Sequence, residues 1–196
     1  AEGSDTASTY PSDVYDLLTT EELTYVAGSA WHAYSGEAAA MSSQRNSYPD
    51  KETFFTEITG GAWSTSFPGN LRWNFENIII GATRNWAQTA LLWNLALDSN
   101  GEPNIRPPAS GPGDVMRGVL TLESDVVKEV EYYILAQVSP YVKSGAVRIH
   151  TNEIDTGSVH IKTVAYRNTD GTFVLIVLNN KWDGDVSFSV NYNEKS

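Results

Sequence analysis

Residues 53–61 read Thr53-Phe54-Phe55-Thr56-Glu57-Ile58-Thr59-Gly60-Gly61, and this stretch gives the first indication of the fold. Its β-branched and aromatic side chains favour a strand, because such side chains pack well on a pleated surface. A turn of Tyr48-Pro49-Asp50-Lys51 precedes the run, and the glycine pair stops it. The stretch therefore predicts a strand that ends on a carboxylate, Glu57.

Two further apolar runs lie on either side of this strand in the sequence. Residues 25–31 are apolar and small, and they lead into a loop that carries His32 and Tyr34. Residues 88–97 are almost continuously apolar, as in a parallel strand that is buried on both faces. Before that run, apolar residues recur at steps of three and four over residues 70–86, which predicts a helix with Asn70 as its N-cap. The alternation predicts a parallel α/β arrangement, although three strands do not close a barrel.

The second half of the chain has a different pattern. Residues 105–118 are rich in Pro and Gly and predict an irregular segment, which a short strand over residues 119–122 follows. Ser124 or Asp125 is then a candidate cap for a helix that runs to about residue 145. After that point, short β-prone runs predict an antiparallel β-module: residues 147–150, 159–166, 172–178 and 186–192. We therefore expect an α/β part over residues 1–145 and a β part over residues 146–196.

Composition argues against several classes of function. The 196 residues are 41% apolar, which is enough to bury a core, and their formal net charge of −11 repels nucleic-acid phosphates and anionic lipid alike. No apolar run approaches the length that spans a membrane. Cysteine is missing from the sequence and the three histidines lack metal-ligand spacing, so neither a metal nor a cofactor is predicted. The first residues carry no signal-peptide pattern.

Polar and aromatic side chains lie at or near the ends of all three predicted parallel strands. They are His32 with Tyr34, Glu57, and Trp93 with Asn94. Functional groups gather at this edge of α/β folds, and an aromatic platform beside a carboxylate and hydrogen-bonding groups suits a sugar ring. Taken singly, each residue also has an ordinary alternative: a solvated carboxylate for Glu57, a satisfied polar pair in a loop for His32 and Tyr34, and core packing for Trp93.

Several motifs in one order give a more specific indication. The chain from about Pro11 onward resembles glycoside hydrolase family 30, and the resemblance is carried by Ala30-Trp31-His32-Ala33-Tyr34-Ser35-Gly36, Phe54-Phe55-Thr56-Glu57-Ile58-Thr59-Gly60-Gly61, Leu92-Trp93-Asn94-Leu95-Ala96-Leu97-Asp98 with Gly101-Glu102-Pro103-Asn104, and Tyr132-Tyr133-Ile134-Leu135-Ala136-Gln137-Val138-Ser139 with Ser144-Gly145-Ala146-Val147-Arg148-Ile149. This resemblance implies an α/β fold: the C-terminal portion, about strands six to eight, of a (β/α)8 barrel, followed by a partial antiparallel β-sandwich.

The resemblance also implies an activity and a set of roles. The family hydrolyses β-glycosides with retention of configuration through a covalent glycosyl-enzyme. Glu57 matches its nucleophile at the end of strand seven, and the Tyr34 hydroxyl is expected to hydrogen-bond that carboxylate. His32, Tyr34, Trp93, Asn94 and Trp63 are expected to bind substrate, with Trp93 as a wall or floor of the sugar pocket. The implied partner is a β-linked glycan or glycoside, and the implied location is extracellular.

One residue of the family's chemistry has no match in this sequence. The family carries its acid/base Glu after an Asn at the end of strand four, and the only Asn-Glu pairs here, Asn152-Glu153 and Asn193-Glu194, belong to the predicted β-module. We therefore expect the chain to be a piece that is inactive without the missing N-terminal half of the barrel. Residues 111–122 resemble the endo-β-1,6-glucanase branch more than the glucosylceramidase branch. The alternatives are a non-catalytic carbohydrate-binding unit and a purely structural remnant.

Overall fold

The computed structural model describes residues 9–103, 112–155, 160–180 and 184–192. Its first half is built on a parallel sheet in the order β1-β2-β4. The strands are β1 (Gly28–His32), β2 (Glu52–Glu57) and β4 (Ala87–Ala90), and both neighbouring pairs run parallel, as the alternating pattern predicts. Two short helices, α1 (Tyr10–Leu17) and α2 (Thr20–Leu23), precede the sheet.

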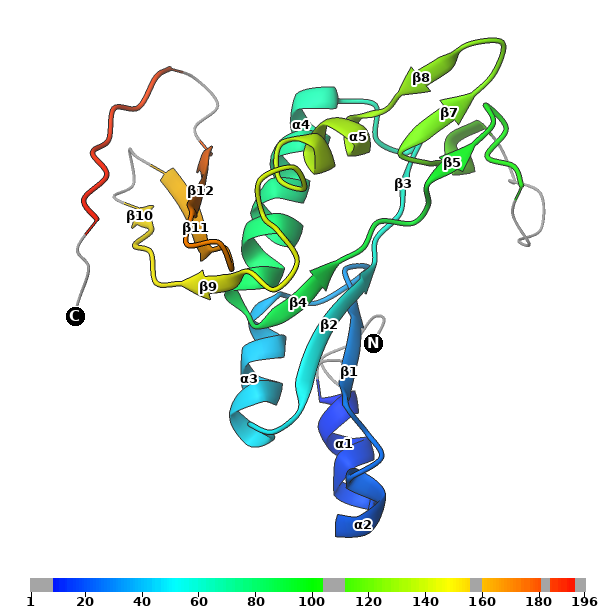
Figure 1. Ribbon diagram of the computed structural model, residues 1–196. Helices are drawn as coiled ribbons and strands as arrows, with labels where there is room; N and C mark the ends of the chain where they lie inside the picture. The colour runs from blue at the N-terminus through cyan, green and yellow to red at the C-terminus, as the bar shows by residue number, and fades with distance from the viewer. Residues whose placement is uncertain (1–8, 104–111, 156–159, 181–183, 193–196) are drawn as a thin grey trace.

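Helices cover one face of this sheet (Figure 1). They are α3 (Ala39–Ser47) and the π-helical segment η2 (Phe75–Ala82). Segment η2 continues helix α4 (Phe67–Asn74). Trp31 and Phe55 on the strands pack against a cluster of helix residues that includes Met41, Ile78 and Ala82. The alternate strand residue Ala30 is exposed, so the two faces of β1 differ sharply in burial.

The loop that the sequence predicts after β1 is present at residues 33–38. Helix α3, which follows it, was not predicted, and only Met41 and Gln44 of its nine residues are buried, so it shows no apolar period. One prediction for the next helix is wrong. The cap of α4 is Ser66 rather than Asn70, since the Ser66 hydroxyl accepts a hydrogen bond from the Gly69 amide at 3.2 Å.

The apolar run over residues 88–97 is shared between two sheets, so the prediction of one strand is wrong. β4 ends at Ala90, and β5 (Ala96–Leu97) pairs in parallel with β7 (Leu120–Leu122). Strand β7 also forms a hairpin with β8 (Val126–Lys128), where the sequence predicts the first turn of a helix. The exposed β-branched pair in β8 extends the sheet instead, and helix α5 covers only Val130–Ala136.

Small elements connect the sheets. Strand β3 (Gly60–Gly61) follows directly after β2 and pairs antiparallel with β6 (Met116–Arg117), and the 3₁₀ turn η3 (Pro112–Asp114) precedes β6.

Among the helices in the part of the chain that the structure describes, none is long and apolar enough to cross a membrane.

The C-terminal part is an antiparallel sheet. It contains β9 (Val147–Ile149), β10 (Ile154–Asp155), β11 (His160–Arg167) and β12 (Phe173–Asn179), with β11 paired to the other three. The predicted strand over residues 186–192 is wrong, because residues 185–192 adopt no regular secondary structure. Although these residues are β-prone, they pair with no strand among the described residues.

The segment η2 joins the two halves, because it packs on both. Ile79 and Ile80 belong to a second core with Ile134, Val164 and other residues of α5, β11 and β12. Figure 1 accordingly shows β11 and β12 on the opposite side of this helix from β2. Ile78 faces the parallel sheet, so η2 is apolar on most of its circumference.

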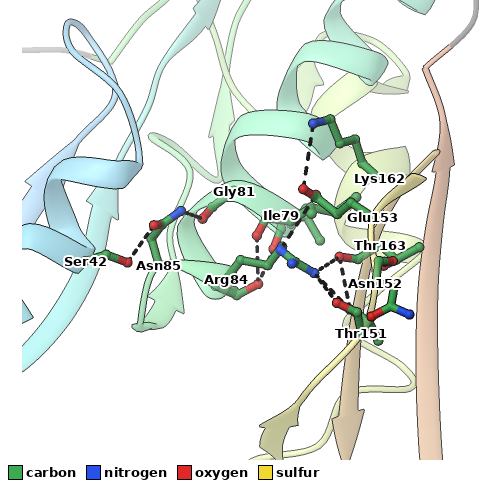
Figure 2. Close-up of polar contacts among 12 residues, drawn as sticks. Ser42, Ile79, Gly81, Arg84, Asn85, Thr151, Asn152, Glu153, Lys162 and Thr163 are labelled. Carbon is green, nitrogen blue, oxygen red and sulfur yellow. Dashed lines mark hydrogen bonds and ion pairs between the residues drawn. The ribbon is translucent and has the colours of Figure 1, made fainter. Parts of the chain in front are cut away.

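Polar contacts reinforce this joint immediately after η2 (Figure 2). Arg84 donates hydrogen bonds to the Thr151 carbonyl, the Thr151 hydroxyl and the Thr163 carbonyl at 2.9–3.2 Å. Its neighbour Asn85 accepts a hydrogen bond from Ser42 of α3 at 2.7 Å. Residues 84–85 are therefore tied both to the α/β part and to the antiparallel sheet.

Candidate active site

Glu57 lies at the end of β2, where the neighbouring parallel strand β1 also ends. The register of the two strands shifts between Trp31 and His32, so that His32 stands opposite Glu57. The Tyr34 hydroxyl donates a hydrogen bond to Glu57 Oε1 at 2.7 Å, and His32 Nδ1 lies 3.8 Å from the same oxygen. The structure thus brings three of the predicted site residues together at the edge where α/β folds place their functional groups.

The carboxylate of Glu57 is held and yet accessible. Its side chain and that of His32 are each 32% exposed. The Tyr34 hydroxyl is also 2.7 Å from Thr59 Oγ1, so Thr59 can donate to the hydroxyl that Glu57 accepts from. Among the described residues no hydrogen bond reaches Glu57 Oε2. One carboxylate oxygen is therefore positioned by a phenol, and the other has no such contact among the described residues.

Trp93 and Asn94 follow β4 and lie beside the residues after Glu57. The Trp93 amide donates to the Ile58 carbonyl at 2.9 Å, and Trp93 forms a parallel bridge with Thr59. Both side chains are half-buried, and the Asn94 Oδ1 atom is buried without a hydrogen-bond partner in the described part of the chain. The structure places this pair next to the Glu57 segment, with no hydrogen bond to Glu57 itself among the described residues.

Tyr34 also borders a cavity of about 500 Å³. Tyr34 and Thr59 line it, as do Trp63, which is 55% exposed, and Trp73, which is 43% exposed. Trp63 belongs to the turn after β3, and Trp73 lies on α4. The predicted site residue Trp63 thus lines a cavity that it shares with Tyr34. Trp73 is a further candidate for substrate binding, which the sequence analysis did not identify.

A buried ion pair forms part of the cavity wall. Arg117 of β6 and Glu131 of α5 make a two-pronged contact, with Nη2–Oε1 at 2.8 Å and Nε–Oε2 at 3.0 Å. The Glu131 side chain is only 5% exposed. Hydrogen bonding to Glu131 raises the pKa of the Arg117 guanidinium above its usual value, against the opposing effect of burial. Arg117 also donates to the Gly61 carbonyl at 3.1 Å, so the pair is fastened to β3.

The glycine pair in β3 has a structural reason beyond ending a strand. A Cβ atom on Gly60 would lie 2.0 Å from Glu131 Oε1, and one on Gly61 would lie 2.1 Å from the Trp63 ring. No side chain fits at either position without moving the ion pair or the indole. The glycine pair after Glu57 was thus the sequence feature that could have indicated other groups packing directly against the β3 backbone. The sequence did not indicate which groups approach.

No metal site accompanies this arrangement in the residues that the structure describes. Within them, no three His, Asp or Glu side chains are grouped so that they could hold a metal ion. The chemistry that the described site offers is that of a hydrogen-bonded carboxylate beside an imidazole, a phenol and exposed indoles.

Comparisons with known proteins find similarity to glycoside hydrolases. Residues 145–196 match the family model described as the glycosyl hydrolase family 30 beta sandwich domain. Curated relatives include putative glucosylceramidase 4 of Caenorhabditis elegans, 29% identical over 79% of this chain and 30% of that protein. Another is the endo-1,6-beta-D-glucanase of Neurospora crassa, 28% identical over 85% of this chain and 35% of that protein. The chain thus spans about a third of the length of these relatives.

Solved structures agree with the sequence matches. The endo-beta1,6-glucanase BT3312 matches with a TM-score of 0.76 and 31% identity, over 91% of this chain and 39% of that one. SrfJ from Salmonella typhimurium matches with a TM-score of 0.73 over 89% of this chain and 39% of that one, and its identity of 21% supports the fold alone.

Proposed function

From its resemblance to glycoside hydrolase family 30, which these matches confirm, we propose that the chain carries the nucleophile side of a retaining β-glycosidase active site. Glu57 is the nucleophile in this proposal. The observation that carries it is the 2.7 Å hydrogen bond from Tyr34 to a partly exposed carboxylate at the end of a parallel strand.

The same proposal assigns the parallel sheet to a barrel. Strands β1, β2 and β4 would be strands six to eight of a (β/α)8 barrel, and the antiparallel sheet would be part of its side β-sandwich. In the described part of the chain, helices cover one face of the sheet, and Ala30 on the other face is exposed. In a closed barrel that inner face is filled by side chains from the remaining strands, which a longer protein would supply.

The geometry fits a double-displacement reaction. In the first step Glu57 Oε2 would attack the anomeric carbon and form an ester, while the bond to the leaving oxygen breaks and that oxygen receives a proton from a second carboxylic acid. In the second step this carboxylate would accept a proton from water, which attacks the same carbon and releases Glu57. Tyr34 would keep the Glu57 carboxylate in one orientation throughout, because its hydroxyl is held by Thr59 as well.

The second carboxyl group is the part that this chain does not supply in our proposal. Glu131 borders the neighbouring cavity, but both its oxygens are bound to Arg117 and its side chain is buried. A group held in this way is a poor proton donor to a leaving oxygen. We therefore place the acid/base residue in a part of the protein outside these residues, and we expect the chain alone to be inactive.

The proposed substrate is a neutral β-linked glycan or glycoside. The relatives are named for β-1,6-glucan and for glucosylceramide, so both are candidates. A net charge of −11 does not oppose a neutral sugar, whereas it disfavours nucleic acid. An extracellular location follows for the full protein if the substrate is a polymer.

Trapping of the covalent intermediate tests this function. A 2-deoxy-2-fluoro-β-glucoside with a good leaving group should label the full-length protein, and peptide mass spectrometry should place the label on Glu57. Glu57→Gln should abolish labelling and turnover, whereas Glu52→Gln at the exposed start of the same strand should leave both intact. A label on a different residue, or turnover by the Glu57→Gln protein, would refute the assignment.

One observation favours a second candidate, a non-catalytic carbohydrate-binding unit. Trp63 and Trp73 present exposed indoles to a cavity, which would bind a sugar whether or not Glu57 reacts. In that case the wild-type protein would hydrolyse no glycan. Its affinity for glycan would fall on substitution of the indoles and would be unchanged in Glu57→Gln.

A further inference from the structure

We propose that the cavity between Trp63 and Trp73 is a second sugar subsite, which binds the ring next to the one that reacts at Glu57. This inference rests on the proposed function and makes it more specific, because it selects a glycan of at least two rings over a glycolipid with one sugar.

The position of the cavity is the first support. Tyr34 and Thr59 line it, and Tyr34 is also hydrogen-bonded to Glu57 at 2.7 Å. The cavity therefore begins one side chain away from the proposed nucleophile. Its volume of about 500 Å³ falls within the usual range of small-ligand pockets, roughly 300–1,000 Å³. A chain of linked sugars could extend from one site into the other without leaving the protein surface.

The chemistry of the lining is the second support. Two indoles that are 55% and 43% exposed offer flat apolar surfaces, which suit the C–H face of a pyranose. Ser64, Asn70 and Asn74 line the same cavity, and although each donates a hydrogen bond within the protein, their side-chain oxygens can accept further hydrogen bonds from sugar hydroxyls. A lipid acyl chain would use the indoles but has no hydroxyl that could donate a hydrogen bond to these oxygens.

The rigidity of the lining is the third support. Arg117 donates to the carbonyl oxygens of Gly61 and Ser64, at 3.1 and 3.4 Å, and so clamps the turn that carries Trp63. Asn70 binds the same turn, since it accepts from the Ser64 hydroxyl at 2.6 Å and donates to the Ser64 carbonyl at 2.9 Å. The Trp63 indole thus stays in place before a ligand arrives, which lowers the entropy cost of binding. Arg117 and Asn70 act as positioning residues.

The test compares two substrates in the full-length protein. β-Glucosyl fluoride has a leaving group too small to reach the cavity, whereas a β-1,6-linked gluco-oligosaccharide should fill it. Trp73→Ala should lower kcat/KM for the oligosaccharide about tenfold more than kcat/KM for the fluoride, the scale of losing one well-packed aromatic contact, mainly through KM. Trp73→Phe should recover much of this loss. Tyr141→Ala, at an exposed aromatic outside the cavity lining, is the control and should change neither rate.

Different outcomes separate this inference from the function on which it rests. If Trp73→Ala lowers both rates equally, or neither, the second subsite is refuted while Glu57 can still be the nucleophile. If Trp73→Ala selectively impairs hydrolysis of glucosylceramide in detergent micelles, the cavity binds lipid and the inference is wrong. Titration calorimetry of the oligosaccharide with Glu57→Gln protein, with and without Trp73→Ala, measures the subsite without any turnover, and equal affinities there would also overturn it.

Discussion

The Tyr34 hydroxyl connects the Glu57 carboxylate to the neighbouring cavity. Tyr34→Phe removes its hydrogen bond to Glu57 and leaves the ring in place. A hydrogen bond to a charged group contributes about 1.5–3 kcal/mol, so we expect kcat of the full-length protein for β-glucosyl fluoride to fall roughly 10- to 100-fold. Tyr48→Phe is a matched control, because Tyr48 donates to the Asp16 carboxylate away from the site. An unchanged kcat in the Tyr34→Phe protein would contradict the role given to this hydroxyl.

Gly60 lies where even a methyl side chain would collide with the Arg117–Glu131 ion pair. A Cβ at this position would lie 2.0 Å from Glu131 Oε1 and 3.0 Å from Arg117 Nη2, so Gly60→Ala should separate the ion pair. Breaking a buried pair costs about 3–5 kcal/mol, and we expect the free energy of unfolding, measured in urea, to fall by about that amount. Gly113→Ala should have little effect, since a Cβ there meets nothing within 4 Å. Equal stabilities of the two variants would show that the pair adjusts without cost.

The contrast between Glu57 and Arg117 explains how much of the site could be predicted. Glu57, His32 and Tyr34 lie at ends of strands that the apolar pattern indicates, and parallel strands bring their ends to one edge. Arg117 reaches the same region through the pairing of β3 with β6, two strands of only two residues each, and it holds Glu131 of α5 there. Strands that short have no period to detect, so this wall of the cavity could not be predicted.

The turn between β11 and β12 shows how one element is attached to the rest. Asp170 in this turn accepts hydrogen bonds from Lys143 Nζ at 2.5 Å, from the Thr172 hydroxyl at 2.7 Å and from the Thr172 amide at 3.0 Å. The Lys143 contact is the main reason why the pKa of Asp170 lies well below its ordinary value of 3.8. The turn is thereby bound to the chain that follows α5.

This lowered pKa predicts a pH dependence of stability. A carboxyl whose folded pKa is depressed stabilises the fold above its unfolded pKa, and the stabilisation is lost as the pH falls through the folded value. We expect the Tm of the wild-type protein to exceed that of Asp170→Asn at neutral pH, and the difference to shrink progressively below pH 3.8. Asp13→Asn, on α1, serves to subtract general acid effects. A Tm difference that stays constant from neutral to acidic pH would contradict this account.

Elements with a marked apolar period were predicted, and those without one were not. The parallel strands and β11 and β12 follow from their β-prone composition. Helix α3 buries only two residues, so its sequence is too polar to indicate a helix. Residues 186–192 show the converse, because β-prone composition alone forms no strand where a neighbour is missing in the described structure. Tertiary pairing, rather than local preference, decided these cases.

The molecule as a whole depends on the joint around η2. Phe75, Ile79 and Ile80 pack toward α5 and the antiparallel sheet, while Ile78 and Ala82 pack toward β1 and β2. The antiparallel sheet is therefore attached to the α/β part through one face of η2, and it can open locally while the other face of η2 stays packed on β1 and β2. The polar contacts of Arg84 then fix the antiparallel sheet against that helix (Figure 2).

Arg84→Met should loosen this joint while the apolar contacts remain. Arg84 is 26% exposed, and its loss would leave the carbonyl oxygens of Thr151 and Thr163 without this donor. Hydrogen bonds to a charged group contribute about 1.5–3 kcal/mol, so the amides of β9 and β11 should exchange hydrogen faster by roughly 10- to 100-fold. The amides of β1 and β2, on the other side of η2, should keep their protection, as should every strand in Arg167→Met, a change at an exposed position of β11. If Arg84→Met instead weakens protection equally in β1, β2 and β11, the two cores behave as a single cooperative unit, and Arg84 does not control the attachment of the antiparallel sheet.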